Sequence, residues 1–204
     1  MRKGVLIAIE GIDGSGKTSV AKRITKWLME NNIKAVYTSE PSKSPIGLLI
    51  KEKIISAPMR RDARIEALLF AADRLWHVIY EIIPYLEEGT VVIADRYYFS
   101  SIAYQGALGA PIEWIKELNK FAPEPELSIY IDITPQEAIR RKRKQGDVKK
   151  LFENIEYLSK VREIYLELVR QNRLVLVNGM KPLDEVVDEA IGKVKSLLLS
   201  RSFS

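Results

Sequence analysis

Cysteine is absent from the sequence of 204 residues, which excludes a disulfide framework and any metal site built on thiolates. Long apolar runs are absent as well, since no stretch approaches the roughly 20 residues that span a bilayer. The opening run MRKGVLIAIEG is too short for a secretory signal. We therefore expect a cytoplasmic protein without a membrane partner.

The sequence also lacks a large excess of charge of one sign, since 32 Lys and Arg residues face 27 Asp and Glu residues, for a net charge of +5. This balance favours anionic ligands, whereas a general nucleic-acid binder usually carries a longer basic stripe. The dense basic run is IRRKRKQGDVKK, residues 139–150. Such a run has three interpretations: a nucleic-acid contact, a solvated helix face, or a lid over a bound anion.

Short β-branched runs alternate with longer segments of helical spacing from end to end. We expect buried parallel strands at residues 4–10, 35–38, 90–94, 127–132 and 174–177. Helices are expected at residues 17–30, 63–80 and 183–199, and two more should begin at Pro111 and Pro135. The pattern predicts one α/β domain over residues 1–204, with a doubly wound, mostly parallel sheet of five strands flanked by helices.

The stretch GIDGSGKT fits G-x-x-x-x-G-K-[ST], and it has an expected strand before it and a helix after it, as a phosphate-binding loop requires. Its backbone N–H groups can point at phosphate oxygens, and the following helix adds its positive dipole end. We expect the Lys17 charge on the β- and γ-phosphates of ATP and the Thr18 hydroxyl on Mg²⁺. The predicted ATP-binding residues are Gly11, Ile12, Asp13, Gly14, Ser15, Gly16, Lys17 and Thr18.

A second polar segment, DRYYFSSIAYQG at residues 95–106, follows the third expected strand. In an open α/β sheet, ligands bind beyond the carboxyl ends of the strands. Asp95 can hold Mg²⁺ there through water, and Arg96 can hold a phosphate. The alternative is a structural ion pair at the end of a strand. The aromatic residues of this segment fit a pocket for a base and a sugar, although they also fit a core.

The motifs EGIDGSGKT, EPSKSPIG, LLFAADRLWH, DRYYFSSIAYQG and YIDITPQEAIRRKR occur in this order, and the sequence resembles the thymidylate kinases over nearly its whole length. The phosphate loop alone is shared by many enzymes, but D-R-Y-x-x-S-x-x-A-Y-Q combined with F-x-x-D-R is far more specific. The resemblance implies the fold of a P-loop nucleoside monophosphate kinase. It also implies Mg²⁺-dependent transfer of the γ-phosphoryl group of ATP to dTMP, which gives dTDP, by a homodimer.

The resemblance assigns three residues to the nucleoside of dTMP. Asp13 corresponds to the acid that accepts the deoxyribose 3′-OH, although an aspartate in such a loop also serves as a local turn acceptor. Phe70 corresponds to the residue that stacks on thymine, and Arg74 to the residue that binds its O4. Their i, i+4 spacing puts both on one helix face. The alternative is that Phe70 belongs to the core and Arg74 pairs with an acid.

Further dTMP contacts follow from the same resemblance. Arg96 corresponds to the clamp on the dTMP phosphate, and a planar guanidinium suits that role. Tyr104 corresponds to the aromatic residue that leaves no room for a ribose 2′-OH, and Gln105 to a neighbour that lines the base pocket. Lys43 stands where the family often carries an arginine near the acceptor phosphate. Because SEPSK replaces the common bacterial REPGG here, the alternative for Lys43 is a solvated surface charge.

The basic run follows the segment LSIYIDITPQEAI, where nucleoside monophosphate kinases carry a mobile segment over ATP, so we expect a small basic lid at about residues 140–153. Some thymidylate kinases have an arginine directly after the loop aspartate, whereas this sequence has Gly14. The cation that stabilises the transition state must then come from elsewhere, and Arg141 and Arg143 are the best candidates. The predicted catalytic residues are Lys17, Arg96, Arg141 and Arg143.

Two competing functions stay open at this stage. The first is a kinase of the same fold that phosphorylates UMP, CMP or dUMP. The second is a P-loop nucleotide-binding protein that holds nucleic acid through its lysine and arginine run, and it predicts RNA-stimulated ATP hydrolysis with steep salt dependence. The second function leaves the DRYYFSSIAYQG segment without a role. We therefore expect ATP and dTMP as the partners, and no nucleic acid.

Overall fold

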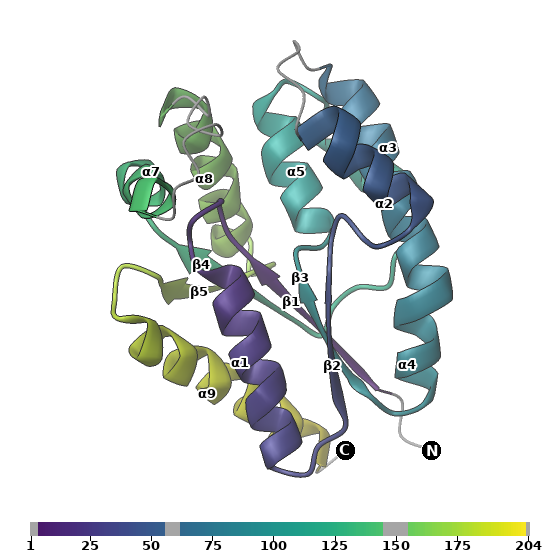
Figure 1. Cartoon of the computed structure of the whole chain (residues 1–204), viewed down its shortest axis with the longest axis vertical. Coiled ribbons are helices and arrows are strands. Elements are labelled where there is room, and N and C mark those ends of the chain that lie inside the picture. Colours follow the sequence, from purple (N-terminus) through teal and green to yellow (C-terminus); the bar gives the residue numbers. More distant parts are fainter. Residues whose placement is uncertain (1–3, 56–61, 145–154, 203–204) are drawn as a thin grey trace.

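A single sheet organises the chain. The computed structural model describes the backbone of residues 4–55, 62–144 and 155–202 and, within these ranges, all side chains except 143, 144 and 202. These residues contain five parallel strands in the order β2-β3-β1-β4-β5 (Figure 1). The strands are β1 (Val5–Glu10), β2 (Ala35–Ser39), β3 (Val91–Asp95), β4 (Leu127–Asp132) and β5 (Val175–Asn178). The predicted α/β fold is confirmed, and its sheet is entirely parallel rather than mostly parallel.

The helices lie between the strands. They are α1 (Lys17–Glu30), α2 (Pro45–Leu49), α3 (Ala63–His77), α4 (Ile83–Glu87), α5 (Tyr98–Ala107), α6 (Ile112–Leu118), α7 (Pro135–Lys144), α8 (Ile155–Arg170) and α9 (Leu183–Ser202), with π-helical turns η1 (Ile50–Ile55) and η2 (Val78–Ile82). None of these described helices is both long and apolar enough to span a membrane.

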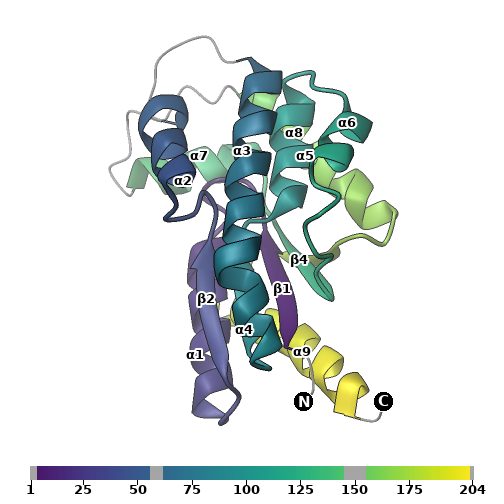
Figure 2. The ribbon, with the colours of Figure 1, turned by 90° about the vertical axis from the view of Figure 1, so that its right-hand side faces the viewer.

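Three of the expected helices differ in extent from the observed ones. The helix expected at 183–199 is longer, because α9 ends at Ser202. The helix expected at 63–80 is longer, because α3, η2 and α4 follow one another without interruption and form one column (Figure 2). Pro135 is the first residue of α7, as predicted. Pro111 is instead the N-cap of α6, because its ψ of 124° is extended and the helical turn starts one residue later.

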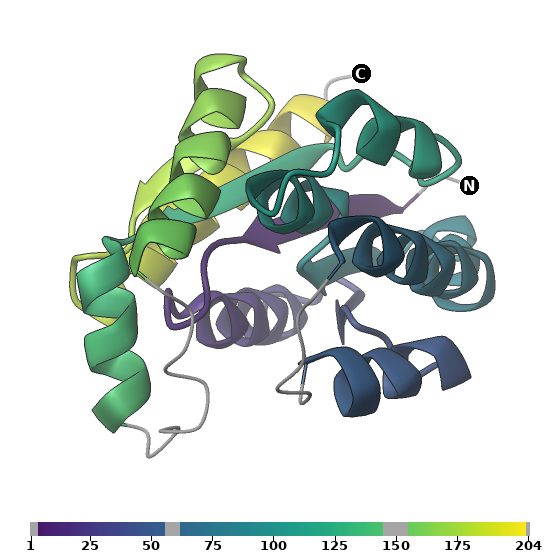
Figure 3. The same cartoon turned by 90° about the horizontal axis from the view of Figure 1, so that it is seen from above.

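Alternate residues of β1 point into two hydrophobic cores, one on each face of the sheet. Val5, Ile7 and Ile9 pack with buried side chains of α1 and α9. Leu6 and Ala8 pack with buried side chains of η2 on the other face. Figure 3 shows α1 and α5 on opposite sides of β1. Both faces of β1 are covered by helices, so its side chains are apolar on both faces. Such apolar runs are the sequence pattern from which the parallel sheet was predicted.

The strand order brings the ends of β1 and β3 together. The chain passes from β1 to the edge strand β2, returns through β3 beside β1, and then places β4 on the opposite side of β1. The register pairs Ile9 with Asp95, so the segments that leave β1 and β3 start at the same level. Ligands of open α/β sheets bind where the connections change direction in this way. The phosphate loop, which follows β1, and the DRYYFSSIAYQG segment, which begins at the end of β3, therefore meet at the carboxyl ends of the strands.

Candidate active site

The phosphate loop connects β1 to α1 through residues with unusual backbone angles. Gly14 and Gly16 have φ values of +87° and +92°, in the left-handed region that glycine adopts without a steric penalty. A Cβ atom on Gly16 would meet nothing within 4 Å, whereas one on Gly14 would lie 2.8 Å from the carbonyl oxygen of Ala138 on α7. The loop is therefore open at Gly16 and in close contact with α7 at Gly14.

Arg96, directly after β3, points its guanidinium at this loop. Its Nη1 donates to the carbonyl oxygen of Gly11 at 3.4 Å and to Oγ of Ser100 at 3.0 Å. The backbone of Arg96 has a φ of +74°, a left-handed conformation that costs a non-glycine residue about 1–3 kcal/mol. Its backbone N–H donates to the carbonyl oxygen of Ile9 at 3.0 Å, and this bond helps to hold the strained residue in place. The guanidinium therefore faces the phosphate loop instead of the core.

Asp13 in the loop is surrounded by positive charge. Its Oδ1 accepts from Arg96 Nη2 and lies 3.4 Å from Lys17 Nζ, and its Oδ2 accepts from Lys142 Nζ at 3.1 Å. Burial alone would raise the pKa of Asp13, but the charges of Arg96, Lys17 and Lys142 hold it well below its ordinary value. Burial and the charge of Arg96 lower the pKa of Lys17, which the charges of Asp13 and Asp95 partly oppose. The loop is thus prepared for further anionic oxygens.

The two predicted metal ligands are Thr18, at the start of α1, and Asp95, at the end of β3, and they are in contact with each other. The Thr18 hydroxyl donates to Asp95 Oδ2 at 2.5 Å, and the Tyr37 hydroxyl donates to the same oxygen at 3.2 Å. The other oxygen, Asp95 Oδ1, is buried and has no hydrogen-bond partner among the described residues. No group of three or more His, Cys, Asp and Glu residues that could hold a metal occurs in the described part of the chain. The unpartnered oxygen of Asp95 fits Mg²⁺, which is usually held by one or two carboxylates together with phosphates and water.

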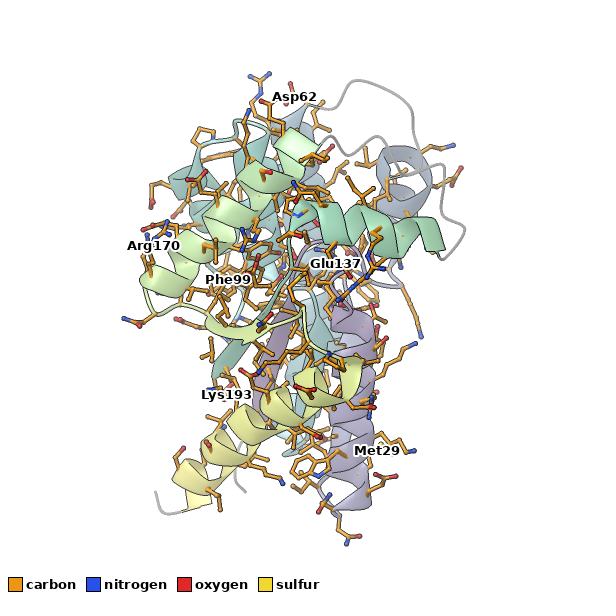
Figure 4. All side chains as sticks on the ribbon, turned by 90° about the vertical axis from the view of Figure 1, so that its left-hand side faces the viewer. Met29, Asp62, Phe99, Glu137, Arg170 and Lys193 are labelled. Carbon is orange, nitrogen blue, oxygen red and sulfur yellow. The ribbon has the colours of Figure 1, made fainter. Side chains whose placement is uncertain are left out.

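Helix α7 lies against the phosphate loop, and Figure 4 shows Glu137 on this helix. Arg141 donates to Glu137 Oε1 at 2.6 Å and to the carbonyl oxygen of Gly179 at 2.8 Å, and its Nη1 lies 3.5 Å from the carbonyl oxygen of Ser15. The α7 cation that reaches Asp13 is Lys142, which the sequence analysis did not select. The side chain of Arg143 lies outside the described residues, as does the part of the predicted lid that falls in residues 145–154.

Comparison with known proteins assigns this architecture to a family. A sequence model of the family described as thymidylate kinase matches residues 9–190. The chain belongs to the thymidylate kinase family. Probable thymidylate kinases of Staphylothermus marinus and Pyrococcus abyssi are 43% and 41% identical to it, over 90% and 97% of this chain and 90% and 98% of their own. A thymidylate kinase of Clostridium novyi is 40% identical over 96% of this chain and 100% of its own.

Two aromatic residues that the thymidylate kinase resemblance assigns to dTMP are half-buried on neighbouring helices. The Tyr104 hydroxyl on α5 accepts a hydrogen bond from the backbone N–H of Asp13 at 3.0 Å. The ring of Tyr104 also lies under the guanidinium of Arg96, whose central carbon is 4.9 Å from the ring centre. Phe70 lies on α3, which packs against α5. Tyr104 thus joins the phosphate loop to Arg96, while the stacking of Phe70 on thymine stays a prediction.

Arg74 is buried, with 1% of its surface exposed. Its Nε and Nη2 donate to Glu40 Oε2 at 2.8 and 2.5 Å, and its Nη1 donates to Ser101 Oγ at 3.2 Å and Asn119 Oδ1 at 2.7 Å. These bonds engage four of the five N–H groups of the guanidinium. The pairing of Arg74 with an acid, the alternative from the sequence, is therefore present. A contact with thymine O4 stays a prediction for the remaining N–H group.

Gln105 and Lys43 lie in contrasting environments. Gln105 is buried and donates to Glu66 Oε2 at 3.0 Å, across the contact between α5 and α3. Lys43 is exposed, because the serines on either side of it turn inward and donate to Asp73 Oδ1 at 2.6 Å each. The motifs in the sequence did not indicate this anchoring role of Asp73. The alternation of small polar residues around Lys43 in SKS was the available signal.

Glu10, the last residue of β1, was also missed. It is fully buried, and its carboxylate accepts hydrogen bonds from the Tyr97 backbone N–H at 2.9 Å, the Ser100 hydroxyl at 2.6 Å and the Tyr165 hydroxyl at 3.0 Å. Burial raises the pKa of Glu10, and these hydrogen bonds and the charge of Arg96 oppose the shift. Because Ser100 also accepts from Arg96, Glu10 supports the guanidinium from behind. An acid that ends an apolar strand was the signal for it.

Proposed function

We propose that this chain is a thymidylate kinase that transfers the γ-phosphoryl group of ATP to dTMP and releases ADP and dTDP. The observation that carries the proposal is the position of Arg96. Its guanidinium lies 3.4 Å from the Gly11 carbonyl oxygen and contacts Asp13, which in turn lies 3.4 Å from Lys17. A phosphate held by Arg96 would therefore lie next to a triphosphate held by the loop, as direct transfer between two nucleotides requires.

On the donor side, the loop amides and Lys17 would bind the β- and γ-phosphates of ATP. Thr18 and Asp95 would hold Mg²⁺, Asp95 through water, and the ion when bound would neutralise charge on the phosphate oxygens. The Ser15 hydroxyl, which is buried without a hydrogen-bond partner among the described residues, supports a loop prepared for a ligand. This part of the site would bind and orient ATP without a general base, because phosphoryl transfer depends mainly on positioning and charge.

On the acceptor side, Arg96 would grip the phosphate of dTMP and Tyr104 would close the site beside it. Binding of this phosphate would compete with Asp13 for the Arg96 guanidinium, and Asp13 would then accept the 3′-OH of the sugar. Phe70 would stack on thymine and Arg74, fixed by Glu40, would offer its remaining N–H group to the base. Gln105 would support this pocket through Glu66, and exposed Lys43 would approach the acceptor phosphate.

The direct test is conversion of dTMP to dTDP by the purified protein with ATP and Mg²⁺. We expect product from the wild type and a fall of about 10²–10³ in kcat/KM for Arg96→Ala, because a charge-stabilising group at the reacting phosphates is lost. Rates with dUMP, UMP and CMP, measured in parallel, decide between dTMP and other acceptors. Absence of dTDP from a wild-type protein that still binds ATP would overturn the proposal.

A homodimer and a cytoplasmic location belong to the same proposal. Large apolar side chains are exposed along the column of α3, η2 and α4, which faces the viewer in Figure 2. They are Ile65 (56%), Leu68 (51%), Leu75 (40%), Ile79 (48%), Tyr80 (64%) and Ile83 (37%). Exposed apolar side chains that form a contiguous surface usually mark a protein interface, and these six lie along one helical column. A second copy of the chain would cover it, and fractionation of the source cells would test the location.

A further inference from the structure

Tyr37 lies on the edge strand β2, next to the strand that ends in the predicted metal ligand Asp95. The parallel register pairs Tyr37 with Ile93 and Ser39 with Asp95. Because alternate residues of a strand share a face, the side chains of Tyr37 and Asp95 lie on the same face of the sheet. That face is covered by α1, since Tyr37 and Ile93 pack in one core with buried side chains of this helix. Tyr37 thus approaches Asp95 from the side of the sheet on which Thr18 lies.

The aromatic ring of Tyr37 is held between β2 and α1. It is half-buried, and the ammonium of Lys22 on α1 lies 5.5 Å from the ring centre. A tyrosine has two rotatable side-chain bonds, so a packed ring holds its hydroxyl group at a defined place. That hydroxyl donates to Asp95 Oδ2 at 3.2 Å. Tyr37 is therefore a rigid support for one oxygen of Asp95.

The hydrogen bonds of Asp95 are unequally distributed between its two oxygens. Oδ2 accepts from both Tyr37 and Thr18, at 3.2 and 2.5 Å. Oδ1 is buried and has no hydrogen-bond partner among the described residues. A buried acceptor without a partner is costly, so it usually marks the place of a water, an ion or a ligand. The two donors on Oδ2 hold the carboxylate in one orientation, and Oδ1 is left to accept from a water of the ion.

A second tyrosine makes the same kind of contact at the end of another strand. Tyr130 on β4 donates to Oδ1 of Asp132 at 2.9 Å. The oxygens of Asp132 also accept from Nε and Nη2 of Arg162, at 2.8 Å each. Both oxygens of this carboxylate therefore have partners, unlike those of Asp95. The pair of Tyr130 and Asp132 is a structural counterpart that lacks an open acceptor, and it supplies a matched control.

We propose that Tyr37 is a positioning residue of the metal site, whose hydroxyl holds Asp95 in the orientation that accepts a water of Mg²⁺. The inference rests on the proposed function, in which the ion is bound together with ATP. Tyr37 acts through Asp95 and not on the reacting atoms. Removal of a group that orients a metal-binding side chain typically lowers metal affinity 10–100-fold. The loss of this one hydroxyl should therefore be visible in the binding of Mg²⁺.

The variant Tyr37→Phe removes the hydroxyl and keeps the packed ring. We expect the KM for Mg²⁺ to rise about tenfold, while kcat at saturating Mg²⁺ stays within about threefold of the wild type. Tyr130→Phe is the control, since it also loses a hydrogen bond from a tyrosine to an aspartate. It should lose a similar amount of stability toward denaturant and keep the wild-type KM for Mg²⁺. A KM for Mg²⁺ that rises equally in both variants, or in neither, would overturn the inference.

Calorimetry with a non-hydrolysable ATP analogue separates the metal from the nucleotide. Tyr37→Phe should weaken binding of the analogue about tenfold in Mg²⁺ and change it by less than about twofold in EDTA, because only the first complex contains the ion. Equal weakening under both conditions would show that Tyr37 acts on the phosphate loop, which contradicts the inference. The measurement needs no acceptor nucleotide. A wild type that makes no dTDP would therefore overturn the proposed function and leave this test intact.

Discussion

At the scale of the residue, the backbone of the phosphate loop determines which groups meet at the site. Gly14 matters for its missing side chain as well as for its φ of +87°, because α7 occupies the space that a Cβ atom would need. The sequence predicts this glycine as a residue of the phosphate loop and shows that the loop lacks an arginine there, but it gives no sign of the contact with α7. Arg96 also has a left-handed backbone, although it is not a glycine. The surrounding structure holds it in this strained conformation, and its guanidinium then faces the loop.

The substitution Gly14→Ala tests the contact between the loop and α7. The new Cβ atom would lie 2.8 Å from the Ala138 carbonyl oxygen, so we expect α7 to be displaced and kcat/KM for dTMP to fall by at least about tenfold. The control is Gly109→Ala, because Gly109 has a φ of +98° but open space around it. Left-handed backbone costs both variants about 1–2 kcal/mol of stability. Equal activities of the two variants would show that the contact has no functional part.

At the scale of the element, α3 carries a buried polar network against the end of β2. His77 Nδ1 lies 3.3 Å from Glu40 Oε1, and its Nε2 lies 2.7 Å from the Thr38 hydroxyl. Thr38 donates its hydrogen to Glu81 at 2.5 Å, so its oxygen must accept from Nε2. Both ring nitrogens therefore carry hydrogen and His77 is an imidazolium. This network fixes α3 and with it the base-side residues.

Protonation of His77 predicts a specific pH dependence of stability. Burial alone would lower the pKa of His77, but the hydrogen bonds to Glu40 and Glu81 and their charges raise it to about 9 from 6.5. Because the folded-state pKa is the higher one, the stabilisation is complete below about pH 6.5 and is lost as the pH rises through about 9. The loss should reach about 3.5 kcal/mol at most, since the pKa rises from 6.5 to about 9 and one pKa unit corresponds to about 1.4 kcal/mol.

Denaturant unfolding from pH 6 to 10 measures this loss. The neutral variant His77→Gln should be less stable than the wild type below about pH 6.5, and the difference should shrink as the pH approaches about 10. The comparison between the two proteins cancels the titration of lysine and tyrosine residues elsewhere. A stability difference that does not change with pH would show that His77 is neutral in the folded protein.

At the scale of the whole molecule, the sheet edge holds the site while the column of α3, η2 and α4 presents an apolar surface to the outside. The same column thus has two faces. Its inner face carries Arg74 and His77, and its outer face carries the exposed apolar side chains. A partner on the outer face would therefore hold the helix that positions the base-side residues. Dimerisation and acceptor binding would then be coupled through one element.

Sedimentation velocity tests the proposed dimer. We expect a dimer for the wild type and a monomer for Leu75→Glu combined with Ile79→Glu, because two carboxylates would be buried in an apolar interface. Leu199→Glu is the control, since Leu199 is 62% exposed on α9, away from the column. A wild-type monomer at micromolar concentration would remove the proposed role of this surface. A dimer that both variants retain would place the interface elsewhere.

Local pattern in the sequence was sufficient for the fold and for the donor half of the site. The strands are short apolar runs, and the ends of all five could be predicted to within a residue. The expectation that all five are buried was wrong for β5, because this strand lies at the edge of the sheet and Val175 and Leu176 are each 37% exposed. The phosphate loop is a local motif whose glycines, lysine and threonine are consecutive or nearly so. The sequence predicted that the segments after parallel strands end at one edge of the sheet, whereas the strand order that puts β3 next to β1, and so Arg96 beside the loop, came from the structure.

Only the tertiary structure decided which side chains of a helix face the site and which are buried away from it. Arg74 bonds to residues 34 and 45 positions away, and such partners leave no local pattern. The contact of Lys142 with Asp13 joins residues 129 positions apart and depends on how α7 is rotated and how closely it packs. The sequence thus determined which elements and motifs exist, because these follow from short-range periodicity. The tertiary structure determined which charges meet, because packing sets the distances between them.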